Sequence, residues 1–411
     1  MGSVRLGGLA KHLPEFGWQP TILTHTLPDK PDPQFQVIQT EYRDRYARME
    51  EGLKIQGSNT KKRMLSRLVL DENEVRRPYI ERLINLIGEI LSFPDGKKAW
   101  KPIALDAAHR LFNNRKVDLL FSSSSPVTTH LIAHDLKRRY NIPWMADLRD
   151  LWTQNHYYPY SPLRKFFERR LERKIFSQAN ALSTTSDPLA DDLRRIHSIP
   201  SIHTIHNGFD PMEVEEVPLT DEFTITYAGA LYQGKRDPGP LFQALEELIE
   251  TQQIDPAVLD IRFYGRKQAW LDKKIQKYNF EKIAQQYGFL PRTEALKKQR
   301  ESQLLLLLNW NDPREVGTYT GKIYEYLAAR RPILSIGAPR GVVTDLLDQT
   351  QSGAYAINGE ELKRVLMKYY HEYRTQDGIP YHGIEDIINL YSHREMAKKF
   401  SIVFDEILGN A

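Results

Sequence analysis

The stretch TGKIYEYLAARRPILSIG, from Thr320 to Gly337, decides the fold class of this sequence. Thr320, as a cap, and Gly321 open an amphipathic helix, and the apolar run after Pro332 predicts a buried strand. The start of such a helix points backbone N–H groups and the positive end of its dipole outward, which suits a phosphate. Glu325 follows one turn later, where its carboxylate can accept hydrogen bonds from two vicinal sugar hydroxyls. Phosphate donors beside a diol acceptor predict a nucleotide-diphosphate site.

Short apolar strands alternate with amphipathic helices through most of the chain, which predicts an α/β fold with parallel sheets covered on both faces. In the first half we expect strands over 20–24, 117–122, 143–147, 181–185 and 202–206. The helices expected there are 3–15, 100–112, 127–140, 162–178 and 187–197. In the second half we expect strands over 223–229, 259–265, 287–290, 304–310, 332–337 and 354–357. This pattern predicts two doubly wound halves.

The domain organisation follows from two interruptions of that alternation. An acidic, turn-rich stretch over 211–221 predicts a linker between an N-terminal domain, 1–212, and a C-terminal domain, 213–383. We expect a last helix within 384–411 to return to the first domain. A charged, helical insertion at about 41–98 is typical of a lid, a partner surface, a membrane-facing element or a solvated excursion.

Composition limits the classes of function. The 411 residues favour two domains, and 41% hydrophobic residues suffice for ordinary cores. The absence of cysteine excludes disulfides and thiolate chemistry and fits a reducing cytoplasm. A net charge of +4 does not indicate a nucleic-acid-binding protein. No apolar run approaches the roughly 20 residues of a membrane span, so we expect a soluble, cytoplasmic protein, with a membrane-surface contact left open.

A basic and aromatic stretch, YYPYSPLRKFFERRLERK, covers Tyr157 to Lys174. Within it, an apolar stripe of helical spacing is formed by Leu163, Phe166, Phe167 and Leu171. We expect this stripe to pack into a core. The alternative is a helix on a membrane surface, whose Arg and Lys side chains would suit anionic lipid headgroups.

The stretch GALYQGKR, from Gly229 to Arg236, follows a predicted strand and nearly spells a P-loop. Arg236 stands where a P-loop has the Ser or Thr that holds magnesium, and an Arg cannot bind a cation. An ATPase or kinase is therefore excluded. The adjacent cations Lys235 and Arg236 could instead clamp a diphosphate and stabilise it as a leaving group.

Several motifs carry a family resemblance. They are GALYQGKRDPGPLFQAL (229–245), NGFD (207–210), YGFLP (287–291) and TGKIYEYLAARRPIL (320–334). Together they resemble the retaining glycosyltransferases of family four, which have the GT-B fold of two Rossmann-like domains facing across a cleft. The segments FPDGKKAW (93–100) and ADLRDLW (146–152) resemble members that act in cell-surface polysaccharide synthesis.

The resemblance implies a role for each matching residue. It assigns Glu325 to the nucleotide ribose, and Lys235 with Arg236 to the donor diphosphate. It also assigns a set of residues to bind the phosphates and the base of the donor. They are Gly229, Gly288, Leu290, Thr318, Tyr319, Thr320, Gly321 and Lys322. Asp147 falls near the reacting sugar, and Gly2, Arg5, Ser125 and Asp150 fall on the acceptor or phosphate side.

The resemblance also implies the chemistry. The donor is a nucleotide-diphosphate hexose, the acceptor a hydroxyl of a glycan carried on a lipid, and the configuration at the anomeric carbon is retained. Such enzymes use no metal ion and no further cofactor. The expected place of the reaction is the cytoplasm, at the inner face of a membrane.

Three positions depart from the family pattern. Gly317 stands where members have a second glutamate, and Ala230 where they have an arginine before the diphosphate lysine. The apolar strand that precedes the first helix in the family is missing from this sequence, which begins at MGSVRLGGLAKHL. We therefore expect a gap or rearrangement in the first sheet, a truncated or misplaced start, and a poorly formed surrounding for Gly2 and Arg5.

Two other functions remain as alternatives. A non-catalytic sugar-nucleotide binding or scaffold protein would bind nucleotide without turnover, and a nucleotide-sugar epimerase would convert the donor without an acceptor. A metal site among His197, His203 and His206 is less expected than structural roles, and so is a hydrolase pair of Asp147 and Asp150.

Overall fold

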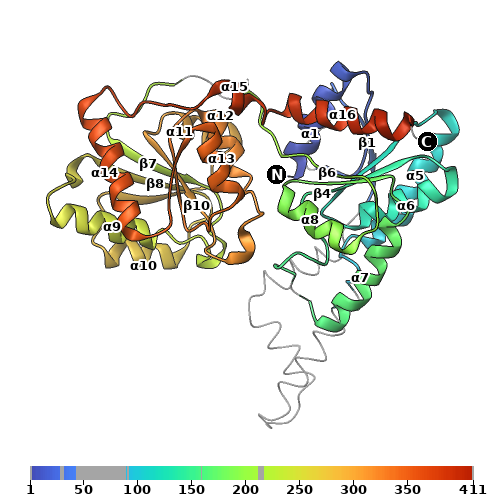
Figure 1. The fold of residues 1–411 in the computed structure, drawn as a ribbon, viewed down its shortest axis with the longest axis horizontal. Helices are drawn as coiled ribbons and strands as arrows, with labels where there is room; N and C mark the ends of the chain where they lie inside the picture. Colours follow the sequence, from blue (N-terminus) through green and yellow to red (C-terminus); the bar gives the residue numbers. More distant parts are fainter. Residues whose placement is uncertain are drawn as a thin grey trace, which may run out of the picture. The chain divides into compact units, whose positions relative to one another are not determined.

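The computed structural model describes residues 2–27, 32–42, 89, 92–158, 160–211 and 217–409. Most of the insertion predicted at 41–98 and part of the linker predicted at 211–221 lie outside these residues. The chain divides into two compact units. Figure 1 shows the fold, with colours that follow the residue number. Unit 1 comprises Met1–Phe16, Thr185–Leu189 and Ile205–Phe400, and unit 2 comprises Gly17–Thr184, Ala190–Thr204 and Ser401–Ala411.

Unit 1 is built on a parallel sheet with the strand order β12-β11-β10-β7-β8-β9. Its strands are β7 (Phe223–Ala228), β8 (Leu259–Tyr264), β9 (Ala284–Gly288), β10 (Leu304–Leu308), β11 (Ile333–Ile336) and β12 (Gly353–Ala356). The chain adds β8 and β9 on one side of β7 and then crosses to add β10 on the other side. The strand order therefore reverses between β7 and β10, and such a switch point is where doubly wound sheets bind their ligands.

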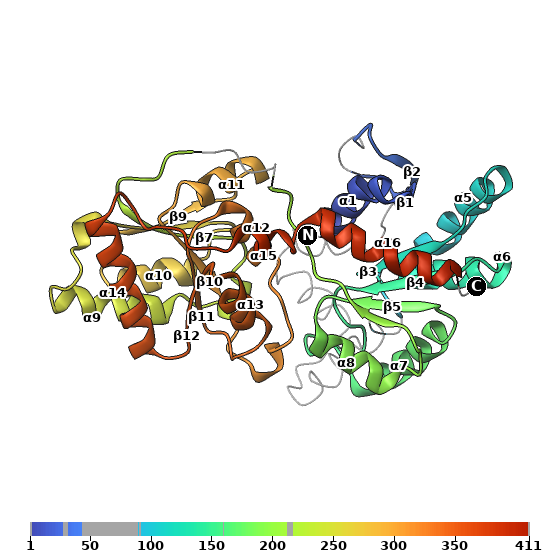
Figure 2. The same ribbon diagram turned by 45° about the horizontal axis from the view of Figure 1, so that its top comes forward.

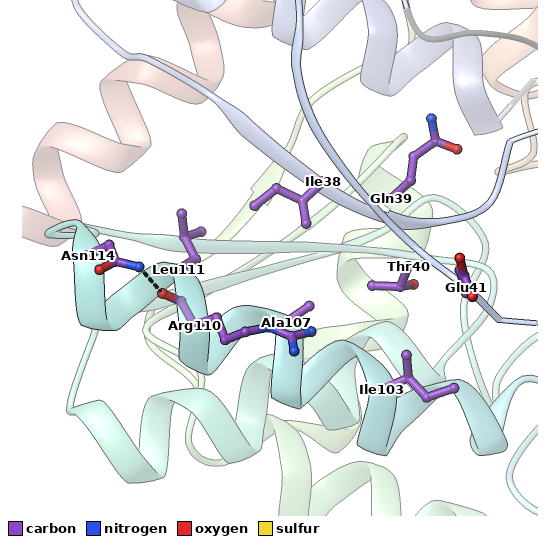
Figure 3. Close-up of a pocket in the computed structure, with 9 residues that line it drawn as sticks. All are labelled: Ile38, Gln39, Thr40, Glu41, Ile103, Ala107, Arg110, Leu111 and Asn114. Atoms are coloured by element: carbon purple, nitrogen blue, oxygen red, sulfur yellow. Dashed lines mark hydrogen bonds between the residues drawn. The ribbon is translucent and has the colours of Figure 1, made fainter.

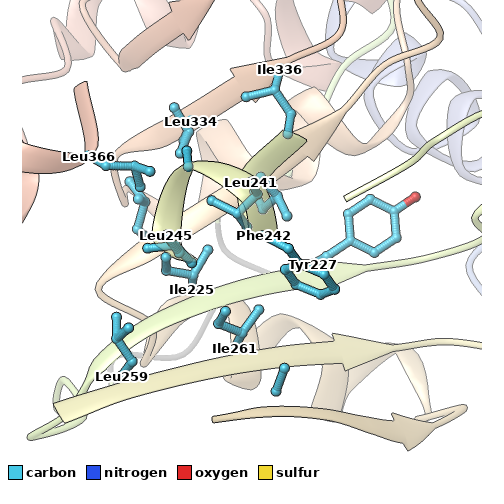
Figure 4. Packing of buried hydrophobic residues seen from close by; sticks show 14 of the residues in the cluster. Ile225, Tyr227, Leu241, Phe242, Leu245, Leu259, Ile261, Leu334, Ile336 and Leu366 are labelled. Atoms are coloured by element: carbon cyan, nitrogen blue, oxygen red, sulfur yellow. The ribbon is translucent and has the colours of Figure 1, made fainter. Parts of the chain in front are cut away.

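Helices cover both faces of this sheet (Figure 2). One face packs on α9 (Gly239–Glu250), α10 (Ala269–Lys277) and α14 (Gly359–Thr375), and Figure 4 shows Phe242 and Leu245 of α9 within this core. The other face packs on α12 (Lys322–Ala329), α13 (Val342–Thr350) and α15 (Glu385–Asn389). A further helix, α11 (Arg292–Arg300), contacts α12 and β7.

Strand β10 shows why the leucine run forms a central strand. Leu304, Leu306 and Leu308 belong to the core on the α9 side, whereas Leu305 and Leu307 belong to the core on the α12 side. Successive side chains of a strand point to opposite faces, so a strand covered on both faces needs apolar residues at every position. The α/β prediction and the buried strand predicted at this run are confirmed.

Unit 2 contains a parallel sheet in the order β3-β4-β5-β6. Its strands are β3 (Leu120–Ser124), β4 (Trp144–Leu148), β5 (Ala181–Thr184) and β6 (Ile202–Thr204). Helix α5 (Lys101–Asn114) precedes β3, and α6 (Thr128–Tyr140), α7 (Pro162–Phe176) and α8 (Asp187–Ile196) follow β3, β4 and β5 in turn. A second parallel pair, β1 (Thr21–His25) with β2 (Gln36–Thr40), forms a separate sheet among the described residues.

The two ends of the chain contribute helices α1 (Gly2–His12) and α16 (His393–Gly409). Gly8 of α1 leaves no space for a side chain, because a Cβ there would overlap the ring of His393 at the start of α16. The last residues of α16 belong to unit 2, where Trp18 Nε1 donates to Asp405 Oδ1 at 3.1 Å.

Two element predictions were wrong in detail, and one strand was missed. β9 begins at Ala284, before the predicted 287–290, because pairing with β8 outweighs the low strand propensity of its glutamines. The predicted last helix is split into α15 and α16. Between them, Ser392 forms an isolated β-bridge with Phe209, and the backbone N–H of Phe209 donates to the carbonyl of Tyr391. β2 was not predicted at all, and only its pairing with β1 defines it.

The apolar stripe of α7 is the largest correction. Leu163, Phe166 and Phe167 are 60%, 54% and 54% exposed, so the prediction that they pack into a core was wrong. The buried face of the helix instead holds Arg164 and Glu168, together with Glu172, Ile175 and Phe176.

Candidate functional site

The candidate site begins where β7 ends, at the switch point of the unit 1 sheet. Gly229 has a φ of 137°, and its N–H donates to the carbonyl of Tyr264 on β8 at 2.7 Å. The chain then makes a short 3-10 helix, Tyr232–Gly234, and continues into Lys235 and Arg236. A glycine at this φ allows the sharp exit from the strand, because side chains rarely adopt that conformation.

Aromatic rings support the two cations after this turn. Lys235 Nζ lies 4.0 Å from the centroid of the Trp310 ring, and the guanidinium carbon of Arg236 lies 4.6 Å from that of Tyr232. A ring face attracts a cation without neutralising its charge. Trp310 follows β10, so its position directly after the LLLLL strand was the signal that could have identified it from the sequence.

Lys322 brings a third cation to the same place from the start of α12. It packs directly on Gly229, where a Cβ would overlap Lys322 Cε, and its Nζ lies 5.1 Å from the centroid of the Tyr227 ring. The pKa of the Lys322 ammonium is lowered to about 7, chiefly by burial and then by the charge of Arg236, while Glu325 opposes the shift. A bound anion would favour the charged form of Lys322.

The start of α12 differs from the sequence prediction. Gly321 is the N-cap and no side chain caps the helix, so the prediction of a capping Thr320 was wrong. Thr320 is buried instead, and its Oγ1 lacks a hydrogen-bond partner within the described part of the chain. A buried hydroxyl of this kind beside Lys322 fits a polar ligand at the positive end of the helix dipole.

Glu325 lies in the first turn of α12 and is joined to the predicted base-lining stretch. Arg292 Nη1 donates to Glu325 Oε1 at 2.6 Å, and Arg292 directly follows the YGFLP stretch of residues 287–291. Gly288 in this stretch has a φ of 93°, and Leu290 is half-buried. The structure therefore brings the predicted ribose and base residues together, through an arginine that the sequence reasoning missed.

The loop before α12 is fixed by packing. The Gly317 carbonyl accepts a hydrogen bond from Ser186 Oγ at 2.6 Å, and a Cβ on Gly317 would lie 2.9 Å from Pro188 Cβ. A glutamate like that of the family which the motifs resemble would therefore not fit at Gly317 without movement. Thr318 N donates to the Glu315 carbonyl at 2.9 Å, and the Tyr319 ring packs on His206 with centroids 5.5 Å apart.

In unit 2, Asp147 has a buried, structural environment. It is fully buried on β4 and accepts hydrogen bonds from Ser123 Oγ at 2.8 Å and Ser183 Oγ at 2.9 Å. These bonds tie β3 and β5 to β4 near the ends of the strands. The geometry gives Asp147 a positioning role for this edge of the sheet.

Ser125 and Asp150 lie beyond the same strand ends and are exposed. Arg149, next to Asp150, donates from Nε to the Ser124 carbonyl at 2.7 Å and from Nη2 to the Ser125 carbonyl at 3.4 Å. The structure therefore links the two loops that carry Ser125 and Asp150.

The expected role of Arg5 on the phosphate or acceptor side is not supported. Arg5 is 2% exposed, and it donates to the carbonyls of Ile205 and His206 and to Asn207 Oδ1. Its guanidinium holds α1 to the segment at 205–207, which is a structural role in a well-formed surrounding. Gly2 is the first residue of α1.

Metal-ligand clusters, membrane-spanning helices and one further pocket bear on other functions. The described residues contain no group of three metal-ligating side chains, and no described helix is long and apolar enough to cross a membrane. A pocket of about 570 Å³ lies between β2 and α5, lined among others by Ile38, Ile103 and Leu111 (Figure 3). None of its lining residues belongs to the set predicted from the sequence.

A family model supports the identity of this fold. The model of the glycosyl transferase 4-like domain matches residues 2–208, just over half of the chain. The chain belongs to the glycosyl transferase 4-like family. The resemblance to family-four glycosyltransferases read from the motifs is thus confirmed. The match ends before Lys235, Lys322 and Glu325, whose roles stay predictions.

Solved structures of low sequence identity share the fold. Sucrose-phosphate synthase from Thermosynechococcus elongatus has a TM-score of 0.67 at 11% identity, over 100% of this chain and 94% of that one. A glycosyltransferase from Rickettsia africae ESF-5 reaches 0.58 at 14% identity, over 100% and 96%. HepE from Anabaena, solved with UDP, reaches 0.58 at 12% identity, over 74% and 82%. No curated protein matched the chain in sequence. These likenesses confirm the GT-B fold.

Proposed function

We propose that this glycosyltransferase transfers a hexose with retention of configuration and without a metal ion, in the synthesis of a cell-surface glycan or polysaccharide. The observation that carries the proposal is the position of Lys322 against Gly229 and beside Arg236, where β7 ends and α12 begins, with Lys235 next to Arg236 in the chain. Three cationic side chains at a switch point suit a diphosphate and supply the positive charge that a metal ion would otherwise bring.

The proposed reaction breaks the bond between the anomeric carbon and the diphosphate oxygen. The acceptor hydroxyl forms the new bond on the same face of the sugar, and its proton passes to the departing diphosphate. Negative charge grows on the diphosphate as the bond breaks, so cations placed beforehand lower the barrier. Lys235 and Arg236 act on this charge, and Lys322 binds the phosphates beside Thr320 and Gly321.

Glu325 would bind the ribose hydroxyls. Its Oε1 accepts from Arg292, which directly follows the stretch around Gly288 and Leu290 where the base would lie. HepE structures solved with UDP, with UDP and glucose, and with UDP-glucose support UDP as the first nucleotide to test.

The acceptor is proposed to be a lipid-linked glycan at the cytoplasmic face of a membrane. Ser125 and Asp150 are the candidates for acceptor contacts in unit 2, because both are exposed beyond the ends of β3 and β4. Asp147 would act by holding Ser123 and Ser183, which shape the same edge.

Hydrolysis of a UDP-hexose in the presence of a chelator tests the proposal, because water can replace the unidentified acceptor. Lys235→Ala should lower the single-turnover rate about 10²- to 10³-fold and weaken nucleotide binding by a much smaller factor. Lys273→Ala, an exposed lysine of α10, is the matched control. A large loss of UDP affinity with an unchanged rate would contradict the assignment, and the anomer released first, followed by NMR, tests retention.

A further inference from the structure

Helix α7 of unit 2 has an inverted distribution of side chains. Its outward face begins with Leu163, Phe166 and Phe167, whose exposed fractions are 60%, 54% and 54%. The spacing of these positions places them on one side of the helix. The rings of the two phenylalanines contact each other edge to face, with centroids 5.6 Å apart. The three side chains therefore form one continuous apolar patch.

Buried charged residues fix this orientation of the helix. Arg164 Nε donates to Glu168 Oε1 at 2.7 Å, and Trp152 Nε1 donates to Glu168 Oε2 at 2.7 Å. Arg164 also donates to the carbonyl of Pro94 at 3.0 Å, and Glu172 accepts a hydrogen bond from the Thr153 hydroxyl. Turning the apolar patch inward would break these bonds and leave charges without partners, so the patch stays outside.

The outward face of α7 is otherwise basic. Its exposed charged residues are Arg169, Arg170, Arg173 and Lys174, and Lys165 is half-buried. Both acidic residues of the helix, Glu168 and Glu172, are buried. Arg170 lies over the Phe166 ring, with its guanidinium carbon 5.7 Å from the centroid. The face thus combines a large apolar patch with positive charge that no carboxylate of the helix offsets on that face.

We propose that this face of α7 docks on a membrane surface that contains anionic lipids. Phenylalanine and leucine side chains insert at the boundary of headgroups and acyl chains, while Arg and Lys side chains contact anionic headgroups. A second copy of the chain fits less well, because two such faces would bring like charges together. The surface would bring the enzyme to an acceptor carried on a lipid, although docking itself does not depend on the donor site.

Flotation of the full chain with lipid vesicles tests this proposal. We expect binding to vesicles of phosphatidylcholine with phosphatidylglycerol, much weaker binding to phosphatidylcholine alone, and loss of binding at high salt. The double change Phe166→Ser and Phe167→Ser should lower the partition coefficient about tenfold or more. Ile402→Ser with Leu408→Ser is the matched control, because these residues are 49% and 38% exposed on α16.

A second pair of variants separates the charge from the apolar patch. Arg170→Glu with Lys174→Glu should weaken binding more than tenfold, at about fivefold or more for each basic residue lost. Lys273→Glu with Lys277→Glu on α10 changes the net charge equally and should have a much smaller effect. Unchanged thermal shifts with UDP in all variants would show that the donor site is intact.

Three results would overturn the proposal. The first is that the parent chain does not bind anionic vesicles. The second is that the Phe166→Ser and Phe167→Ser variant binds them as well as the parent does. The third is that the α10 charge variant loses as much binding as the α7 charge variant. Light scattering without lipid tests the second copy as occupant. Self-association that the phenylalanine variant abolishes would assign the patch to a dimer instead.

Discussion

Lys322 shows how a single buried residue can couple ligand binding to pH. Its pKa is lowered to about 7, first by burial, so in the unliganded protein the amine is mostly neutral above pH 7. A bound diphosphate raises this pKa, because it places negative charge beside the amine. The complex then holds more protons than the unliganded protein, so binding takes up a proton and the affinity falls as pH rises above 7.

Calorimetry in buffers of different ionisation enthalpy measures this proton directly. At about pH 8.5 we expect UDP binding to take up a large fraction of a proton in the parent chain and almost none in Lys322→Met. Lys273→Met should behave as the parent does. Equal uptake in the parent and in Lys322→Met would show that another group titrates.

Gly229 packs against Lys322, and replacing this glycine should lower the free energy of unfolding for two separable reasons. Gly229→Ala places a methyl group on Lys322 Cε and forces a side chain to a φ of 137°. We expect a loss of about 1–3 kcal/mol in the free energy of unfolding. In a Lys322→Ala background the clash disappears and the backbone strain remains, so the loss should shrink without vanishing. Denaturant unfolding of the parent, Gly229→Ala, Lys322→Ala and the double variant measures these losses. An identical loss in both backgrounds would contradict the contact between Gly229 and Lys322.

At the scale of elements, α7 reverses the usual relation between polarity and stability. Glu168→Ala leaves the buried Arg164 without its carboxylate partner and should cost about 3–5 kcal/mol. Phe166→Ser changes an exposed side chain and should cost about 0.5 kcal/mol or less. Thermal unfolding of both variants checks the comparison. A larger loss for Phe166→Ser would mean that the phenylalanine is covered in the folded protein.

The same helix shows what sequence periodicity can and cannot predict. The pattern predicted the helix over 162–178, and the structure has it over Pro162–Phe176. Periodicity locates an apolar face but does not say whether a core or a surface covers it. The orientation depends on hydrogen bonds from Trp152 to Glu168 and from Thr153 to Glu172, and the fold brings these partners together. The buried position of β10 was predictable, because five successive leucines leave no polar face, although the strand ends at Leu308 and not at residue 310.

At the scale of the whole molecule, the motifs predicted the family and the GT-B fold because each lies at the carboxyl end of a strand or the start of a helix. The contacts that join these motifs were not predictable from them. The ion pair of Arg292 with Glu325, the support of Lys235 by Trp310 and the buried state of Lys322 arise from chain segments far apart in the sequence. Arg5 was misjudged for the same reason, since its partners lie at 205–207.

The central claim is that Glu325 and the cations near it form a nucleotide-diphosphate donor site. Thermal unfolding without metal, with a panel of nucleoside diphosphates and their sugars, tests it on the parent chain, Glu325→Ala and the exposed control Glu360→Ala. We predict that one nucleotide stabilises the parent and the control, by about 2.7 kcal/mol at 100 times its Kd, and does not stabilise Glu325→Ala. Equal stabilisation of Glu325→Ala, or no stabilisation by any nucleotide, would contradict the claim.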